Sequence, residues 1–206
     1  MATQQPTRLN RKQAQAQTHE RLIAAARQVF LDRGFHAASV ADIAAEAGYT
    51  TGAIYSNFGG KDELFLAMLD AELAERALAQ RDRILESETF EGMAHAAGRD
   101  LHRAGVRDPA MTPLIVEFWT YVASKPELRD RASALHERQI AWIAELLRNG
   151  CERHGVALRI SYEEAARGGG ALSRGVRLER LLDPAGVAED DFVEMFAAYV
   201  TGLVAT

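Results

Sequence analysis

Apolar residues recur at intervals of three and four along most of this chain, which is the spacing of amphipathic helices, and alternating strand-like stretches are scarce. The chain is also rich in Ala, Leu, Glu and Arg, which favour helices. An all-α fold is therefore predicted. Glycine, proline and capping residues divide the pattern into expected helices over residues 18–33, 39–47, 50–58, 61–85, 89–104, 109–124, 127–154, 162–182 and 190–203.

Clear stop and start signals separate the first three expected helices. Gly34 suits the C-terminal end of the first helix. Ser39, with Asp42 three residues later, resembles a capping box that opens the second helix, and Gly48 ends that helix. The third helix then begins at Thr50 or Thr51 and is little more than two turns long.

One local conflict lies in the expected helix over residues 162–182, which contains three consecutive glycines at 168–170. Three glycines cost a helix several kcal/mol relative to alanine, by a rough sum of about 1 kcal/mol each. We therefore expect a kink at this point or a close crossing with another helix.

The segment between Ser39 and Lys61 carries the strongest functional signal. Small residues allow its two helices to approach, and Ile43 and Ile54 would lock the pair from inside. The residues left facing outward are hydroxyls, an amide, a phenol and a glycine, which suit contacts with base edges or phosphates in a DNA major groove. These residues are Thr50, Thr51, Gly52, Tyr55 and Asn57. A plain helical hairpin inside an all-α core is the alternative.

Charge is distributed in a way that fits a DNA-binding N-terminus. Residues 1–61 carry seven Lys or Arg and four Asp or Glu, a net charge of +3, whereas the whole chain has −5, which leaves −8 for the remainder. Such asymmetry favours a basic module that faces phosphates and an acidic body that does not.

The fuller pattern closely resembles the DNA-binding domain of the TetR (tetracycline-repressor) family. The residues at the positions of the family signature are Gly48, Thr50, Gly52, Tyr55, Phe58, Lys61 and Leu64, and the resemblance covers about residues 18–69. It implies that residues 50–57 form the recognition helix, that Ser39, Tyr55 and Lys61 hold phosphates, and that Phe58 packs against the first helix. It also implies a basic flexible arm at 1–17, a helix-turn-helix domain at 18–62, and an effector-binding and dimerisation domain at 63–206.

The resemblance further implies that the last two helices form a four-helix bundle between two copies of the chain. The apolar residues that would supply this interface are Leu172, Val176, Leu181, Phe192, Phe196 and Val200. Their ordinary alternative is packing within one chain.

An effector cavity is implied among the middle helices of the larger domain. The residues that could line it are Met93, His95, Arg99, His102, Phe118, Trp119, Tyr121, Arg138 and Trp142. The two tryptophans favour an aromatic or otherwise largely apolar effector, although aromatic residues at helical spacing more often belong to a core.

The function that follows is a dimeric repressor that a small-molecule effector releases from a palindromic double-stranded DNA operator. An activator, or a member of the same fold regulated by a partner protein, is the first alternative; an enzyme using Cys151 and His154 is a remote one.

No cofactor or metal is expected. Cys151 is the single cysteine, and no cluster of histidines stands near it at the spacing of metal ligands. The charge-free tail at 195–206 is too short for a membrane helix, and the single cysteine favours a reducing cytoplasm.

Overall fold

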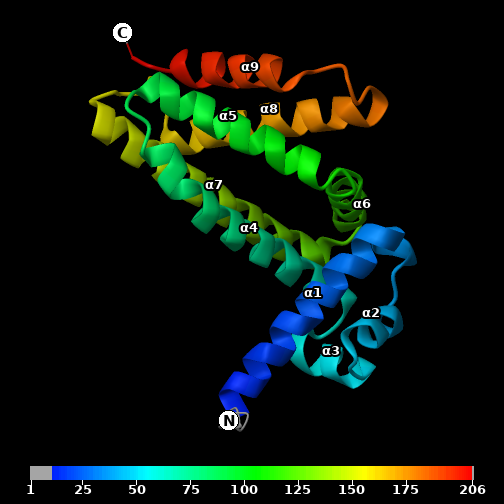
Figure 1. The fold of residues 1–206 in the computed structure, drawn as a ribbon. Helices are drawn as coiled ribbons and strands as arrows, with labels where there is room; N and C mark the ends of the chain where they lie inside the picture. Colours follow the sequence, from blue (N-terminus) through cyan, green and yellow to red (C-terminus); the bar gives the residue numbers. More distant parts are fainter. Residues whose placement is uncertain (1–10, 206) are drawn as a thin grey trace, which may run out of the picture. The chain divides into compact units, whose positions relative to one another are not determined.

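The computed structural model describes residues 11–205, apart from the side chains of residues 11, 76–80, 82, 83 and 85. These residues form nine α-helices in two compact units that divide between Leu69 and Asp70, which confirms the all-α prediction (Figure 1). The first unit contains α1 (Arg11–Ala37), α2 (Val40–Ala47), α3 (Thr51–Phe58) and the start of α4 (Lys61–Leu85).

Helix α1 begins earlier than the periodicity predicts. Residues 11–17, which the sequence assigned to a flexible arm, are the first two turns of the helix, and the rest of that arm lies outside the described residues. Residues 12–17 are exposed, so these turns depend on the helix propensity of Lys, Gln and Ala rather than on burial of an apolar face. At the other end Gly34 breaks the helical geometry with φ 78°, as expected, and one further turn follows it.

Helices α2 and α3 have the predicted ends. The Ser39 side chain accepts a hydrogen bond from the Asp42 N–H, and the Asp42 carboxylate accepts one from the Ser39 N–H, so the capping box is confirmed. Gly48 ends α2 in the left-handed conformation at φ 71°, which favours glycine. Ile43 and Ile54 are both fully buried, as the helix-turn-helix interpretation requires.

Behind this pair, three phenylalanines form the core of the first unit. The ring centroids of Phe30 and Phe65 lie 5.0 Å apart and those of Phe35 and Phe65 lie 5.1 Å apart, both in edge-to-face geometry. All three side chains are fully buried. This aromatic cluster ties the end of α1 to the start of α4 and so supports the helix pair α2–α3.

The second unit contains the remainder of α4 together with α5 (Phe90–Arg107), α6 (Met111–Ala123), α7 (Pro126–His154), α8 (Tyr162–Leu182) and α9 (Glu189–Thr201). Helix α9 lies along α5 and α8, and α7 packs against α8 (Figure 1). The main core of this unit is formed by buried residues of α5, α8 and α9 with the end of α7.

The glycine run at 168–170 marks a close helix crossing, and α8 continues through it. A Cβ atom at Gly168 would lie 1.9 Å from the Tyr199 hydroxyl oxygen of α9, so only glycine fits against that side chain. On α5, a Cβ at Gly98 would lie 3.3 Å from the Val193 Cα of α9. Glycines on α5 and α8 thus allow α9 to pack closely against both helices.

No helix within the described part of the chain is both long and apolar enough to cross a membrane.

Candidate DNA-binding surface

Helix α3 presents one polar face to solvent. Thr50, Thr51 and Gly52 at its N-terminus are exposed, and Tyr55, one turn later, is 58% exposed. Ile54 faces the opposite way and is fully buried. The structure therefore brings together four of the five residues predicted for the recognition face and leaves their hydrogen-bonding groups accessible.

Asn57 is placed differently from its neighbours on α3. Its side chain is half-buried, and its Nδ2 donates a hydrogen bond to the Ala53 carbonyl oxygen at 2.7 Å. That bond occupies one of the two amide hydrogens. Asn57, which the sequence predicts to face outward with the others, consequently lies at the edge of the exposed face.

Ser39, a predicted phosphate contact, is exposed and already serves as the N-cap of α2. Its hydroxyl donates to the Asp42 carboxylate at 2.6 Å. The hydrogen bonds from Ser39, with a smaller contribution from Arg33, hold the pKa of the Asp42 carboxyl below its ordinary value. Arg33 pairs with the same carboxylate at 2.7 Å. The polar side chains at the first turn of α2 are thus held in place by one another at the surface of the first unit.

Lys61, the other predicted phosphate contact, has a structural role that the sequence did not reveal. Its ammonium donates to the carbonyl oxygens of Phe35, His36 and Ala38 at 2.8, 3.4 and 3.0 Å. It also lies 4.6 Å from the centroid of the Phe35 ring. All three ammonium hydrogens are therefore used by carbonyl oxygens in the last turn of α1 and just after it. A phosphate contact by Lys61, which stays a prediction, would require some of these bonds to be given up.

Besides the Arg33–Asp42 ion pair, further side chains of α1 contact the helix-turn-helix. The half-buried Phe58 ring lies 4.5 Å from the His19 ring, as expected of a residue that packs against the first helix. The Thr18 hydroxyl lies 3.4 Å from the Tyr49 hydroxyl, in the turn between α2 and α3. Tyr49 was not among the predicted site residues, although its place directly after the turn glycine is a usable signal. These contacts hold the recognition helix to the rest of the first unit.

In the second unit, the residues predicted for an effector cavity divide into separate groups. Met93 belongs to the core of α5 and α9 and leaves no room for a side chain at Gly150, where a Cβ would lie 2.1 Å from its sulfur. His102 accepts a hydrogen bond from Arg180 at 2.7 Å and is largely buried. His95 bonds to its own helix and to Glu194 of α9. The described contacts of these three α5 residues with other helices are made to α7, α8 and α9.

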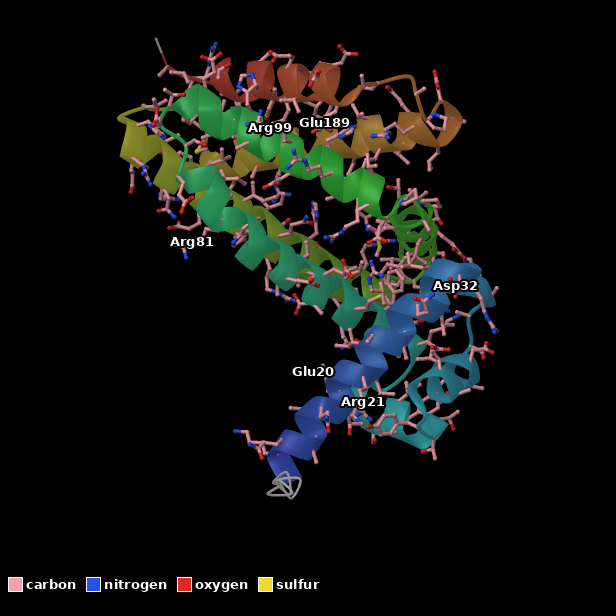
Figure 2. All side chains as sticks on the ribbon, in the orientation of Figure 1. Glu20, Arg21, Asp32, Arg81, Arg99 and Glu189 are labelled. Atoms are coloured by element: carbon pink, nitrogen blue, oxygen red, sulfur yellow. The ribbon has the colours of Figure 1, made fainter. Side chains whose placement is uncertain are left out.

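Two predicted cavity arginines are on the surface. Arg99 is exposed on α5, and Glu189 marks the start of α9 nearby (Figure 2). Arg138 is exposed and pairs with Asp70 at 3.0 Å. Both side chains are therefore accessible to solvent rather than enclosed, and their place in an effector cavity stays a prediction.

The remaining predicted cavity residues lie on α6 and α7. Phe118 is buried, and its ring lies 6.5 Å from that of the half-buried Tyr121. Trp119 is 45% exposed, and its ring lies 6.5 Å from that of His136 on α7. Trp142 is half-buried. Helices α6 and α7 pack together, so these four residues lie on neighbouring helices, and a cavity between them stays a prediction.

The predicted dimer surface needs correction as well. Val176, Phe192, Phe196 and Val200 are buried in the core of their own chain. Helix α5 covers the face of α9 that carries the last three, and Val176 of α8 belongs to the same core. Leu172 is partly buried against the same core, and Leu181 alone of the six is exposed. The large apolar residues that remain exposed on α8 and α9 are Leu178, Leu181, Leu182 and Met195.

Cys151, the nucleophile of the enzymatic alternative, is fully buried. Burial, with a smaller contribution from Glu152, raises the pKa of its thiol, which disfavours the reactive thiolate. The residue packs in the α5–α9 core and has the character of a structural cysteine.

Family models match both units of the chain. The model described as bacterial regulatory proteins, tetR family, matches residues 22–68, and that of the BetI-type transcriptional repressor C-terminal domain matches residues 90–205. The chain belongs to the tetR family. It is a helix-turn-helix transcriptional regulator, and the face of α3 described above lies within the family's DNA-binding region.

Curated tetR-family relatives agree with this assignment. The transcriptional repressor BepR of Brucella suis is 27% identical over 160 residues, which are 74% of this chain and 75% of that protein. The transcriptional activator FasR of Mycolicibacterium smegmatis is 48% identical over 48 residues, which are 23% of this chain and 22% of that protein.

Solved structures share the complete fold. A transcriptional regulator from Pseudomonas aeruginosa PAO1 is 28% identical, with a TM-score of 0.71 over 96% of this chain and 93% of that one. FadR of Bacillus subtilis, solved in complex with stearoyl-CoA, is 17% identical with a TM-score of 0.70 over 91% of this chain and 98% of that one, a likeness of fold alone.

Proposed function

We propose that this tetR-family regulator is a repressor that works in the cytoplasm, binds a near-palindromic DNA operator as a homodimer, and leaves it when a small molecule binds the second unit. The observation that carries the DNA-binding part is the face of α3. A fully buried Ile54 fixes the helix, while Thr50, Thr51 and Tyr55 present polar groups that can contact bases and phosphates.

Exposed apolar residues support the homodimer. Leu178, Leu181, Leu182 and Met195 on α8 and α9 leave large apolar side chains in contact with water, and Leu182 is 91% exposed. A second copy of the chain would remove this surface from water, and a twofold arrangement would present two α3 helices to one operator. A dimer of this kind reads half-sites about 34 to 36 Å apart or a multiple of that spacing.

Effector control would act through the difference in affinity of the ligand for two states of the dimer. A coupling of about 1 to 3 kcal/mol gives roughly 5- to 150-fold release of the operator, and DNA must weaken ligand binding by the same factor. Helix α4 runs without interruption from Lys61 to Leu85 and so crosses from the first unit into the second, which makes it the natural carrier of such coupling. FadR, with the same fold, binds an acyl-CoA.

An activator is the second candidate, because the relative FasR is one and its similarity covers the DNA-binding region. Repression and activation differ in where the operator lies relative to the promoter, not in how α3 contacts it. The BepR similarity, which extends over most of the chain, favours repression.

Selection from random DNA duplexes tests the proposal. The purified protein should enrich a twofold-symmetric motif, whereas a Thr51→Ala, Tyr55→Ala double variant that retains its fold should enrich none. Enrichment of an asymmetric motif, or of none by the wild type, would contradict binding by a symmetric dimer.

A further inference from the structure

Arg174 is a half-buried arginine of α8 that lies beside an aromatic ring. Its guanidinium is folded back toward Gly170, where a Cβ atom would come within 3.0 Å of Nη1. The guanidinium carbon is 5.6 Å from the centroid of the Trp119 ring on α6. The third glycine of the run at 168–170 thus makes room for a cation that faces α6.

No described carboxylate pairs with this cation. Neighbouring arginines on the same two helices do have such partners: Arg167 pairs with Glu137, and Arg148 pairs with Glu145 and Glu163. Burial alone lowers the pKa of Arg174, with no opposing contribution from an acidic group. Holding a charge partly out of water without a counterion costs stability, so an uncompensated guanidinium of this kind is a candidate for binding an anion.

The side chains around Arg174 suit an organic anion better than an inorganic one. Trp119 is 45% exposed, so part of its indole is open to a ligand. The ring of His136 on α7 lies 6.5 Å from that of Trp119 and edge-on to it. Burial, together with the charge of Arg174, lowers the pKa of His136 and favours its neutral form. Helices α6, α7 and α8 pack on one another. They contribute the indole of Trp119, the neutral imidazole of His136 and the cation of Arg174, respectively.

We propose that Trp119, His136 and Arg174 bind a small organic anion, with its acidic group on the guanidinium of Arg174 and its apolar or aromatic body on the indole of Trp119. Anion binding at this site does not depend on the proposed function. Only the role of the anion as the effector rests on it. The sequence favoured an aromatic or otherwise largely apolar effector, and this site adds an acidic group to that description. A bound anion would offset the charge of Arg174 and so raise the pKa of His136 from its lowered position, and binding should therefore take up protons at acidic pH, below about 6.5.

Two dyes that differ in one acidic group provide the test. 1-Anilinonaphthalene-8-sulfonate is an aromatic anion, and N-phenyl-1-naphthylamine is the same ring system without the sulfonate. Both are titrated into the full-length wild type and into Arg174→Met, Arg174→Lys and Arg129→Met. Arg129→Met is the matched control, because Arg129 is an exposed arginine on α7 whose loss changes the net charge by the same amount.

Arg174→Met should raise the Kd of the sulfonate at least tenfold, about 1.4 kcal/mol, and leave that of the uncharged dye within a factor of two. Arg174→Lys should lie between it and the wild type, because it keeps the charge but not the planar fork. Arg129→Met should change neither Kd. Arg174→Met should also melt at the same temperature as the wild type or higher, since it removes a cation without a counterion; a structural arginine would lower the melting temperature instead.

The proposal is overturned if the wild type does not bind the sulfonate, if Arg174→Met leaves its Kd unchanged, or if both dyes weaken together. It is also overturned if Arg174→Met converts a dimer to a monomer in sedimentation, which would make this face a subunit contact. Failure of the proposed function is a separate result: a protein that selects no symmetric duplex without any dye is not the proposed repressor, whatever the dyes show.

Discussion

The close crossing of α8 and α9 predicts that two glycine substitutions on one helix have opposite effects on stability. In Gly168→Ala the new methyl carbon would lie 1.9 Å from the Tyr199 hydroxyl oxygen and 2.7 Å from the ring carbon that bears it. Tyr199 must move, and its hydrogen bond to the Ala165 carbonyl, 3.0 Å long, is lost or strained. In Gly175→Ala the methyl group meets nothing within 4 Å.

The magnitudes follow from three contributions. Alanine stabilises a helix by about 1 kcal/mol relative to glycine, and both variants gain this. Gly168→Ala loses about 1 kcal/mol for the hydrogen bond and about 1 to 3 kcal/mol for overpacking. The net expectation is a loss of about 1 to 3 kcal/mol for Gly168→Ala and a gain of up to about 1 kcal/mol for Gly175→Ala.

Thermal unfolding followed by circular dichroism at one fixed protein concentration measures both. For a chain of this size 1 kcal/mol shifts the Tm by about 2 to 4 °C, so the two variants should lie on opposite sides of the wild type. Tyr199→Phe removes the nearest atom and should reduce the cost of Gly168→Ala in a double-mutant cycle. A Gly168→Ala protein as stable as Gly175→Ala would refute the close crossing.

Further predictions concern caps, charges and the recognition face. Ser39→Ala should lower the stability of the first unit by about 1 kcal/mol in urea unfolding, because α2 loses its capping box; unchanged stability would argue against the cap. Lys61→Met should cost about 1 to 3 kcal/mol through its lost carbonyl bonds; weaker DNA binding with unaltered stability would show that phosphate contact is its main role. Burial lowers the pKa of His102, so stability should fall as pH drops below about 6.5, where the unfolded chain takes up the proton first. His102→Gln should flatten that fall in melts between pH 7.5 and 5.5, and an equally steep fall would contradict the assignment. In DNA titrations, Thr51→Ala should relax preference at particular bases by about 1 to 3 kcal/mol, whereas Tyr55→Phe should weaken all duplexes alike; the reverse pattern would exchange their roles.

Local signals predicted the helix ends well wherever the chain carries a capping residue. Helix α8 has the predicted bounds, Tyr162–Leu182, because Ser161 caps its start and Asp183 with Pro184 stops it. The start of α1 was missed by seven residues, since residues 11–17 are polar helix formers that give neither a stop nor an apolar stripe.

The sequence could not predict which residues contact one another in the folded chain. The spacing of Phe192, Phe196 and Val200 identifies one apolar face of α9, but not whether α5 or a second chain covers it. Lys61 occupies a family signature position, yet its carbonyl partners at residues 35–38 become its neighbours only in the folded chain. Arg174 is one arginine among many in the sequence, and what distinguishes it appears only in the folded chain: it is half-buried beside Trp119 without a described acidic partner.

Methylation interference on the selected operator tests the central claim, that α3 of each subunit contacts DNA in the major groove. Dimethyl sulfate modifies guanine N7 in the major groove and adenine N3 in the minor groove. We predict that guanine N7 methylation blocks binding in two clusters related by a twofold axis and about 34 to 36 Å, or a multiple of this, apart. Interference confined to adenine N3, or to a single cluster, would contradict major-groove binding by a symmetric dimer.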